Sequence, residues 1–101
     1  GVVENALNGA SPEARAGYAA FEARPCTSCH LPLSDSPVGA PDLSTVTGRI
    51  AFEDLEQVLT VGRMEAGMPP PVPAFEISER EAVIEFLRWL AESREDLEVG
   101  L

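Results

Sequence analysis

Lysine is missing from this 101-residue chain, and both cysteine and histidine are scarce. The sequence has two cysteines and one histidine, and its seven basic side chains are all arginines. No apolar run approaches the roughly 20 residues that cross a bilayer, and residues 1–8 lack the basic and apolar regions of a signal peptide. We therefore expect no direct membrane insertion of this segment, and we interpret it as a mature or excised form of one soluble domain.

Negative charge dominates the chain. Its 17 acidic residues against 7 arginines give a net charge of −10. Such a chain repels phosphate backbones and anionic lipid headgroups, so we expect neither nucleic acid nor a membrane surface as its main partner. The charge favours a partner with a basic docking patch, unless the acidity serves only to keep the protein soluble.

Three segments carry helix signals, and no segment alternates like a β-strand. The first helix is predicted over residues 12–24, with Ser11 as its N-cap and Pro12 at its first position. The second is predicted over residues 52–61, where Gly62 ends it. The third is predicted to open with a capping box formed by Ser78 and Glu81. The predicted apolar faces consist of Ala14, Gly17, Tyr18 and Phe21, then Phe52, Leu55, Val58 and Leu59, then Val83, Phe86, Leu87, Trp89 and Leu90.

The segments between these helices are rich in proline. Residues 31–47 show no sustained period and predict a long irregular loop, and residues 68–73 hold four prolines that exclude a helix. The fold class is therefore all-α, with three main helices joined by long loops. We divide the chain into an N-terminal extension (1–10), one domain (11–96) and a C-terminal tail (97–101).

Both cysteines and the histidine fall in one pentapeptide, Cys26-Thr27-Ser28-Cys29-His30. This C-x-x-C-H pattern is typical of c-type haem attachment, in which two thiols form thioethers with one edge of a porphyrin and the next imidazole binds iron. The pattern predicts one covalent haem c on Cys26 and Cys29, with His30 as a metal ligand. The alternatives are a zinc site, which lacks further ligands, a redox disulfide, which lacks its βαβ setting, and a packed histidine beside buried thiols.

A haem held by one histidine needs a partner on its other face, and methionine is the usual one in electron-transfer cytochromes. The chain has two candidates, Met64 and Met68. We favour Met68 because the following Pro69 biases it toward extended geometry and the proline run stiffens the segment. Met64 stays open as the alternative ligand, and either methionine could be core filler.

Several segments together resemble the class I cytochrome c family over residues 12–91. They are Gly17-x-x-x-Phe21 ahead of Cys26, Pro41-Asp42-Leu43 followed by Gly48-Arg49, Gly67-Met68-Pro69, and Phe86-Leu87-Arg88-Trp89-Leu90. The resemblance implies the cytochrome c fold, with helices and long loops wrapped around one covalent haem, and a crossing of the two terminal helices at which we expect Gly17 to contact Trp89. It also implies that the Pro41 carbonyl accepts a hydrogen bond from His30 and that Arg49 pairs with a haem propionate.

With His30 and Met68 on the iron, the expected function is one-electron transfer between redox proteins by a soluble monomer, and not enzymatic catalysis. The alternatives are a haem domain or subunit of a larger redox complex, and a gas-sensing cytochrome whose distal methionine is labile. By resemblance, haem attachment implies a periplasmic or other extracytoplasmic location.

Overall fold

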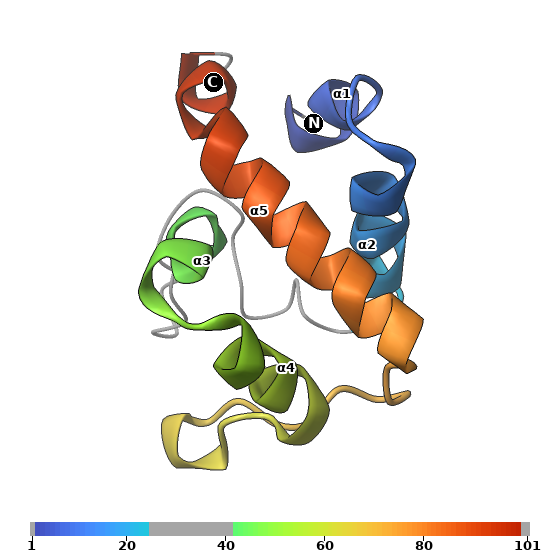
Figure 1. Ribbon diagram of the computed structural model, residues 1–101, viewed down its shortest axis with the longest axis vertical. Helices are drawn as coiled ribbons and strands as arrows, with labels where there is room; N and C mark the ends of the chain where they lie inside the picture. Colours follow the sequence, from blue (N-terminus) through green and yellow to red (C-terminus); the bar gives the residue numbers. More distant parts are fainter. Residues whose placement is uncertain (1, 25–41, 100–101) are drawn as a thin grey trace.

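The fold is built on one long helix, against which the other helices pack. The computed structural model describes residues 2–24 and 42–99, in which the elements follow the order α1 (Val2–Leu7), α2 (Pro12–Glu22), η2 (Leu43–Thr45), α3 (Val46–Arg49), α4 (Phe52–Val61), η3 (Met64–Ala66) and α5 (Ile77–Val99), where η denotes a 3-10 turn. In Figure 1, α5 runs diagonally between α1 and α2 on one side and α3 and α4 on the other. Across these two ranges the only β pairing is an isolated bridge between Arg63 and Met68, which confirms the all-α prediction.

Helices α2 and α5 make the central packing contact of the fold. A Cβ added at Gly17 would overlap the carbonyl group of Ala82, so only glycine lets the two backbones approach this closely. The predicted close approach is confirmed, and the atoms nearest to Gly17 belong to the Ala82–Val83 backbone. The contact with Trp89 stays a prediction. Trp89 lies about two turns further along α5, where it stacks on Phe86 with ring centroids 6.1 Å apart.

Phe86 is the centre of the aromatic core. Its side chain has no exposed surface, and its ring centroid lies 5.2 Å from that of Tyr18 and 5.8 Å from that of Phe21. Such tilted aromatic pairs add to the hydrophobic stabilisation of a core. The predicted apolar faces of α2 and α5 are therefore confirmed, with Tyr18 and Trp89 partly buried at the edge.

The ends of the helices agree only partly with the predictions. Ser11 caps α2 as expected, accepting a hydrogen bond from the Ala14 N–H at 3.1 Å. Helix α5 instead begins at Ile77, so the capping box predicted for Ser78 and Glu81 is wrong. The Glu79 carboxylate accepts the backbone N–H of Glu76 at 2.9 Å and takes the role expected of Glu81.

Helix α4 has the predicted bounds, and Gly62 follows it with φ of 73°. Leu55 is buried, but Phe52 is 38% exposed and does not point inward as predicted. Its position at the first residue of the helix leaves it at the edge of the packed surface. The Arg88 guanidinium lies 5.6 Å over the Phe52 ring and covers it in place of the core.

Two segments contain helices that the sequence did not predict. From Asp42 onward the expected loop forms η2 and α3, because the Asp42 side chain accepts the Ser44 N–H at 2.9 Å and caps the turn. Within residues 1–10, α1 buries Val3 and Leu7, and the Tyr18 hydroxyl donates to Glu4 at 2.7 Å. Helix α5 also continues past residue 96, where Leu97 is buried.

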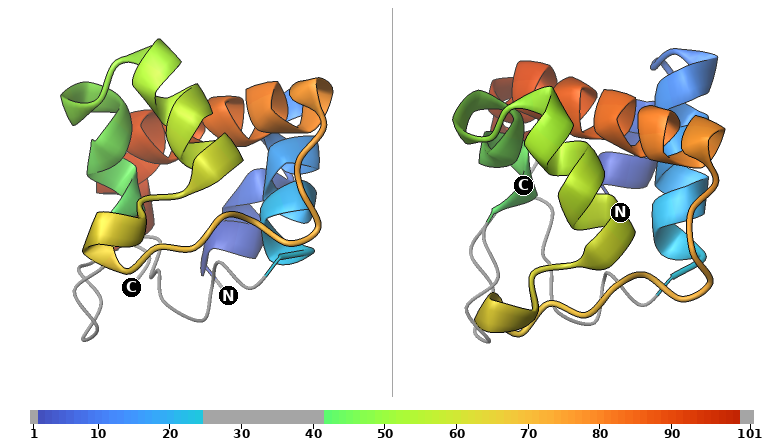
Figure 2. Two further views of the ribbon diagram at one scale, coloured as in Figure 1. Left: turned by 90° about the horizontal axis from the view of Figure 1, so that it is seen from below. Right: turned by 60° about the horizontal axis from the view of Figure 1, so that its bottom comes forward.

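A long extended segment connects η3 to α5. Figure 2 shows this segment, which we call the strap (residues 68–76), crossing from the end of the α4–η3 region to the side of α2. The proline run accounts for its extended form, as predicted. None of the helices in the described ranges has the length and apolar character of a bilayer-spanning segment.

Candidate haem site

The predicted site residues divide into two groups. Cys26, Cys29, His30 and Pro41 lie outside the described residues, so the attachment motif and the proximal proline stay predictions. Arg49 and Met68 are described, as are the residues that flank the motif, Arg24 on one side and Asp42 on the other. The geometry of the site is therefore built from Met68, Arg49 and the segments that enter and leave the motif.

Met68 is fixed on a tight, hydrogen-bonded loop. The Arg63 N–H donates to the Met68 carbonyl oxygen at 2.8 Å, and the Met68 N–H donates to the Arg63 carbonyl oxygen at 3.0 Å. Gly67, with φ of 84°, closes the turn between them. Met68 is half-buried, whereas Met64, on η3 within the same loop, is 68% exposed.

The strap passes directly over the end of α4. A Cβ added at Gly62 would lie 2.6 Å from the Met68 carbonyl oxygen and 2.6 Å from the Pro69 carbonyl carbon. Gly62 also has φ of 73° and ψ of −166°, a backbone region that is essentially restricted to glycine. The absence of a side chain at Gly62 therefore sets how closely Met68 and its neighbours approach α4.

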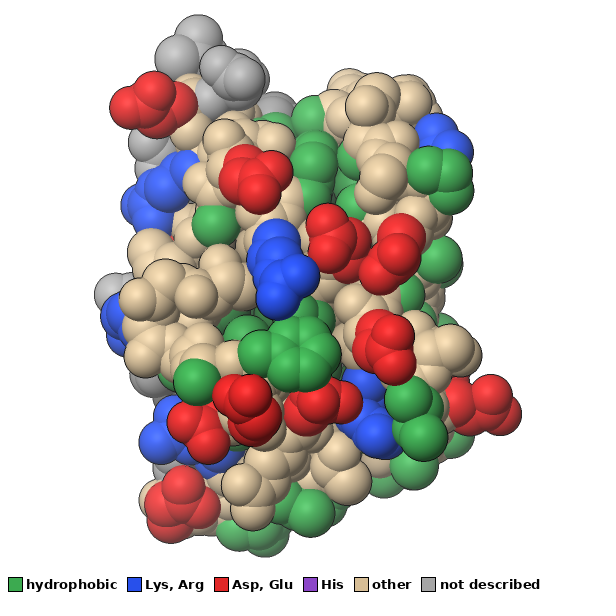
Figure 3. All heavy atoms as spheres, in the orientation of Figure 1, with side chains coloured by type: hydrophobic (Ala, Val, Ile, Leu, Met, Phe, Trp, Pro, Cys, Tyr) green, Lys and Arg blue, Asp and Glu red, His purple; other side chains and the backbone are tan. Residues whose placement is uncertain are grey.

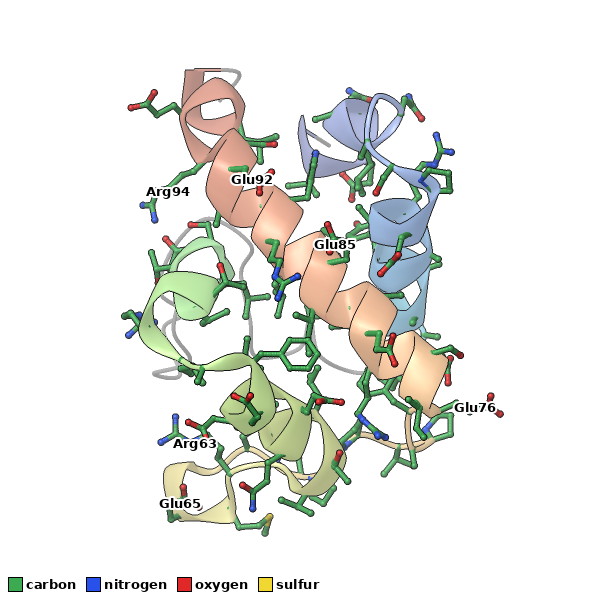
Figure 4. The ribbon with its side chains drawn as sticks, viewed as in Figure 1. Arg63, Glu65, Glu76, Glu85, Glu92 and Arg94 are labelled. Carbon is green, nitrogen blue, oxygen red and sulfur yellow. The ribbon has the colours of Figure 1, made fainter. Side chains whose placement is uncertain are left out.

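A hollow of about 490 Å³ lies between the end of α3, one face of α4 and the Met68 loop. Its described lining combines apolar side chains with two arginines, Arg49 and Arg63, and includes Ile50, Asp54, Gln57, Val58, Val61, Gly62 and Glu65. Figure 4 shows Arg63 and Glu65 on the chain that follows α4, where they form an exposed ion pair at 3.5 Å. Ile50, Val58 and Val61 offer apolar surface to a ring, and Arg49 offers a guanidinium to a carboxylate of that ring. The lining also holds the carboxylates of Asp54 and Glu65, and Arg63 is paired with Glu65.

The segment that follows Pro41 is anchored to α5. Asp42 is buried, and its carboxylate accepts from Arg94 at 3.0 Å and from the Ser44 hydroxyl at 2.7 Å. The same Arg94 nitrogen donates to the Ser44 hydroxyl oxygen at 2.8 Å, and in Figure 4 Arg94 extends from α5 toward η2 and α3. This network therefore fixes Asp42, the residue that directly follows Pro41 in the sequence.

Arg24 is held by a second network. Its side chain is 5% exposed and donates to the carbonyl oxygens of Ala20 and Pro73, both at 2.9 Å, and of Ala74 at 3.2 Å. It also forms a two-pronged pair with Glu79, in which each bond is 3.2 Å long. The Arg24 guanidinium lies 4.0 Å over the ring of Phe75.

The Arg24 contact affects the titration of Glu79. The backbone N–H of Glu76, followed by the Arg24 guanidinium, holds the pKa of the Glu79 carboxyl below its ordinary value. Since the folded-state pKa is lowered, the stability contributed by this carboxylate is present above the ordinary carboxyl pKa. It is lost as the pH falls through the lowered value.

Sequence reasoning missed Arg24, Asp42 and Arg94, although two of them carry a signal. Arg24 continues the apolar positions 14, 17 and 21 of α2, and Arg94 falls between Leu90 and Leu97 on the buried stripe of α5. A charged residue on an apolar helix face indicates a buried charge that requires partners. Asp42 carries no comparable signal.

Comparison with known protein families identifies the family of this chain. A family model described as cytochrome c matches residues 14–91, which is more than three quarters of the chain. The chain belongs to the cytochrome c family. Searches of curated proteins and of solved structures gave no match to this chain. The matched range includes the C-x-x-C-H motif, Arg24 with its partners, and the Met68 loop, whereas Arg94 lies just beyond it.

Membership of the cytochrome c family implies covalent haem c and haem-based electron transfer, and such proteins are typically electron carriers rather than enzymes. The described residues fit this group. The half-buried Met68 supplies a thioether, Ile50, Val58 and Val61 supply apolar surface, and Arg49 supplies a positive charge for a carboxylate. When bound, haem supplies one-electron exchange at iron.

Proposed function

We propose that this cytochrome c is a mono-haem one-electron carrier in which His30 and Met68 are the axial ligands of the iron. The observation that carries the proposal is the placement of Met68. Met68 is half-buried on a loop closed by two backbone hydrogen bonds to Arg63. From Met68 the strap crosses toward α2, the helix that precedes the attachment motif (Figure 2). Met64 is largely exposed, which makes it the weaker candidate.

In this proposal the protein's residues hold the haem and prevent small molecules from binding to the iron. Cys26 and Cys29 attach it, His30 occupies one axial position, and Met68 occupies the other, so that no small molecule reaches the iron without displacing a ligand. Pro41 orients the His30 imidazole by accepting its ring N–H. Arg49, which lines the hollow, offsets the charge of a propionate.

We further propose that the partner is a redox protein with a basic docking patch, that the carrier acts as a monomer, and that it acts outside the cytoplasm, where c-type haem is attached. Acidic side chains gather over α4 and α5 on the face in Figure 3. The exposed acids of these two helices include Glu53, Asp54, Glu81, Glu92 and Glu95. Their negative potential steers a positively charged partner toward the molecule.

Electron transfer to two matched acceptors tests this proposal. The ferrous protein is mixed with a basic redox protein and with an acidic one of similar potential, at low and at high ionic strength. We expect transfer to the basic acceptor to be faster at low salt by about tenfold or more, and to slow as salt screens the attraction. Rates that are equal and independent of salt contradict the proposed partner, and failure to reduce either acceptor contradicts the carrier function.

A further inference from the structure

Arg24 joins the end of α2 to the strap and the start of α5, two neighbouring segments that lie far from it in the sequence. It follows α2 and stands two residues before Cys26, yet its guanidinium bonds to Pro73 and Ala74 on the strap and to Glu79 on α5. These contacts span 49 to 55 residues of chain. Among the described residues, Arg24 therefore connects the chain just before the attachment motif to the strap, which carries Met68.

The geometry uses the full bonding capacity of the guanidinium. Arginine has five N–H donors in a fixed plane, and Arg24 makes five hydrogen bonds, to four different acceptor residues. Lysine has three donors at a single point and cannot satisfy acceptors spread in this way. The side chain is also covered on one face by the Phe75 ring, so its position is fixed by both polar and apolar contacts.

The strap is thus held at both ends by different means. Near its start, the backbone pairing of Arg63 with Met68 and the close packing on Gly62 fix the ligand loop. Near its end, Arg24 donates to the carbonyl oxygens of Pro73 and Ala74 and is itself paired with Glu79. Between these ends four prolines restrict the backbone, which couples the position of the far end to that of Met68.

We infer that Arg24 is a positioning residue for the distal ligand: together with Glu79 it holds the strap against the end of α2 and so holds Met68 toward the iron. This inference rests on the proposed ligation by Met68. It means that the partly buried ion pair of Arg24 and Glu79, at the far end of the strap, contributes to the strength of the iron–sulfur bond. A purely structural role would instead lower stability and leave that bond unchanged.

The test measures how readily an added ligand displaces the methionine. Imidazole is titrated into the ferric holoprotein, and loss of the far-red absorption band that marks iron–sulfur ligation is followed. We expect Arg24→Met to bind imidazole about tenfold or more tightly than the wild type, the size expected for loss of charge-assisted hydrogen bonds. Amide hydrogen exchange in residues 64–76 should also be faster in this variant.

Leu7→Ala is the matched control. Leu7 is buried on α1, away from the strap, and its truncation lowers stability without touching Arg24 or Glu79. We expect its imidazole affinity to stay within about twofold of the wild type. If Leu7→Ala and Arg24→Met increase the affinity equally, Arg24 acts only through global stability and the inference is wrong.

Two milder variants keep the test decisive if Arg24→Met does not fold. Arg24→Lys and Glu79→Gln each remove part of the Arg24 hydrogen-bond network, and both should increase imidazole affinity by a smaller factor than Arg24→Met. No increase in either one overturns the inference. A wild-type protein without the far-red band would instead overturn the proposed Met68 ligation, so the two failures are distinguishable.

Discussion

Replacing Met68 with Ala is expected to abolish the far-red band of the ferric spectrum and to lower the reduction potential by on the order of 0.1 V or more. The reason is that a thioether ligand favours the ferrous state, and axial ligands as a group set haem potentials over a range of roughly 0.8 V. A visible spectrum and a potentiometric titration measure both effects. The same variant should bind carbon monoxide rapidly when ferrous, because one axial position is then open.

Met64→Ala is the control for this prediction. Met64 is on the same loop but is largely exposed, so its removal should leave the far-red band and the potential nearly unchanged. If Met64→Ala removes the band and Met68→Ala keeps it, the ligand assignment is wrong. Rapid and complete carbon monoxide binding by the wild type would favour a gas-sensing protein with a labile methionine.

Gly62→Ala is expected to destabilise the holoprotein by roughly 2–6 kcal/mol and to weaken the far-red band. The cost combines roughly 1–3 kcal/mol for a backbone region restricted to glycine with roughly 1–3 kcal/mol for overpacking. The added Cβ would lie 2.6 Å from the Met68 carbonyl oxygen, so the loop can accept it only by moving Met68. Chemical unfolding and the ferric spectrum measure the two effects.

Gly67→Ala separates backbone strain from this contact. Gly67 also has positive φ, at 84°, but a Cβ there meets nothing within 4 Å. We expect a loss of about 1–2 kcal/mol from strain alone, with the far-red band retained. If Gly67→Ala and Gly62→Ala affect the band equally, the close packing of the strap on α4 does not position Met68.

The local signals of the sequence were sufficient for the helices that carry most of the core. Ser11 and Pro12 mark the start of α2, and Gly62 marks the end of α4, because each residue acts on the backbone within its own turn. The glycine at position 17 also indicated a close helix crossing. The backbone that lies nearest to Gly17, at Ala82 and Val83, was not predicted, because the relative shift of two crossing helices depends on all of their contacts and not on one pair.

Tertiary contacts decided the features that the sequence did not predict. The start of α5 is set by Glu79, which bonds both to the Glu76 N–H and to Arg24, a residue 55 positions away. Helix α1 is only six residues long, too short to be stable alone, and it is held by burial of Val3 and Leu7. No local pattern encodes such contacts.

For the candidate site, the sequence indicated the residues proposed to bind the haem better than the residues that hold the surrounding segments in place. The residue types of the C-x-x-C-H motif and of Met68 are dictated by thioether and iron bonding, so a short pattern is enough to identify them. Arg24 and Arg94 support the site through partners on distant segments. Their positions on apolar helix faces indicate burial, but only the structure identifies what they bond to.

Intact-mass measurement of the natively matured protein tests the central claim most directly. Covalent attachment through Cys26 and Cys29 predicts a mass equal to that of the polypeptide plus one haem, which persists after denaturation and acid extraction. Substitution of both cysteines by Ala should remove this added mass. A mature protein with the mass of bare polypeptide would contradict covalent haem attachment, and with it the ligands and the electron-transfer function proposed for this chain.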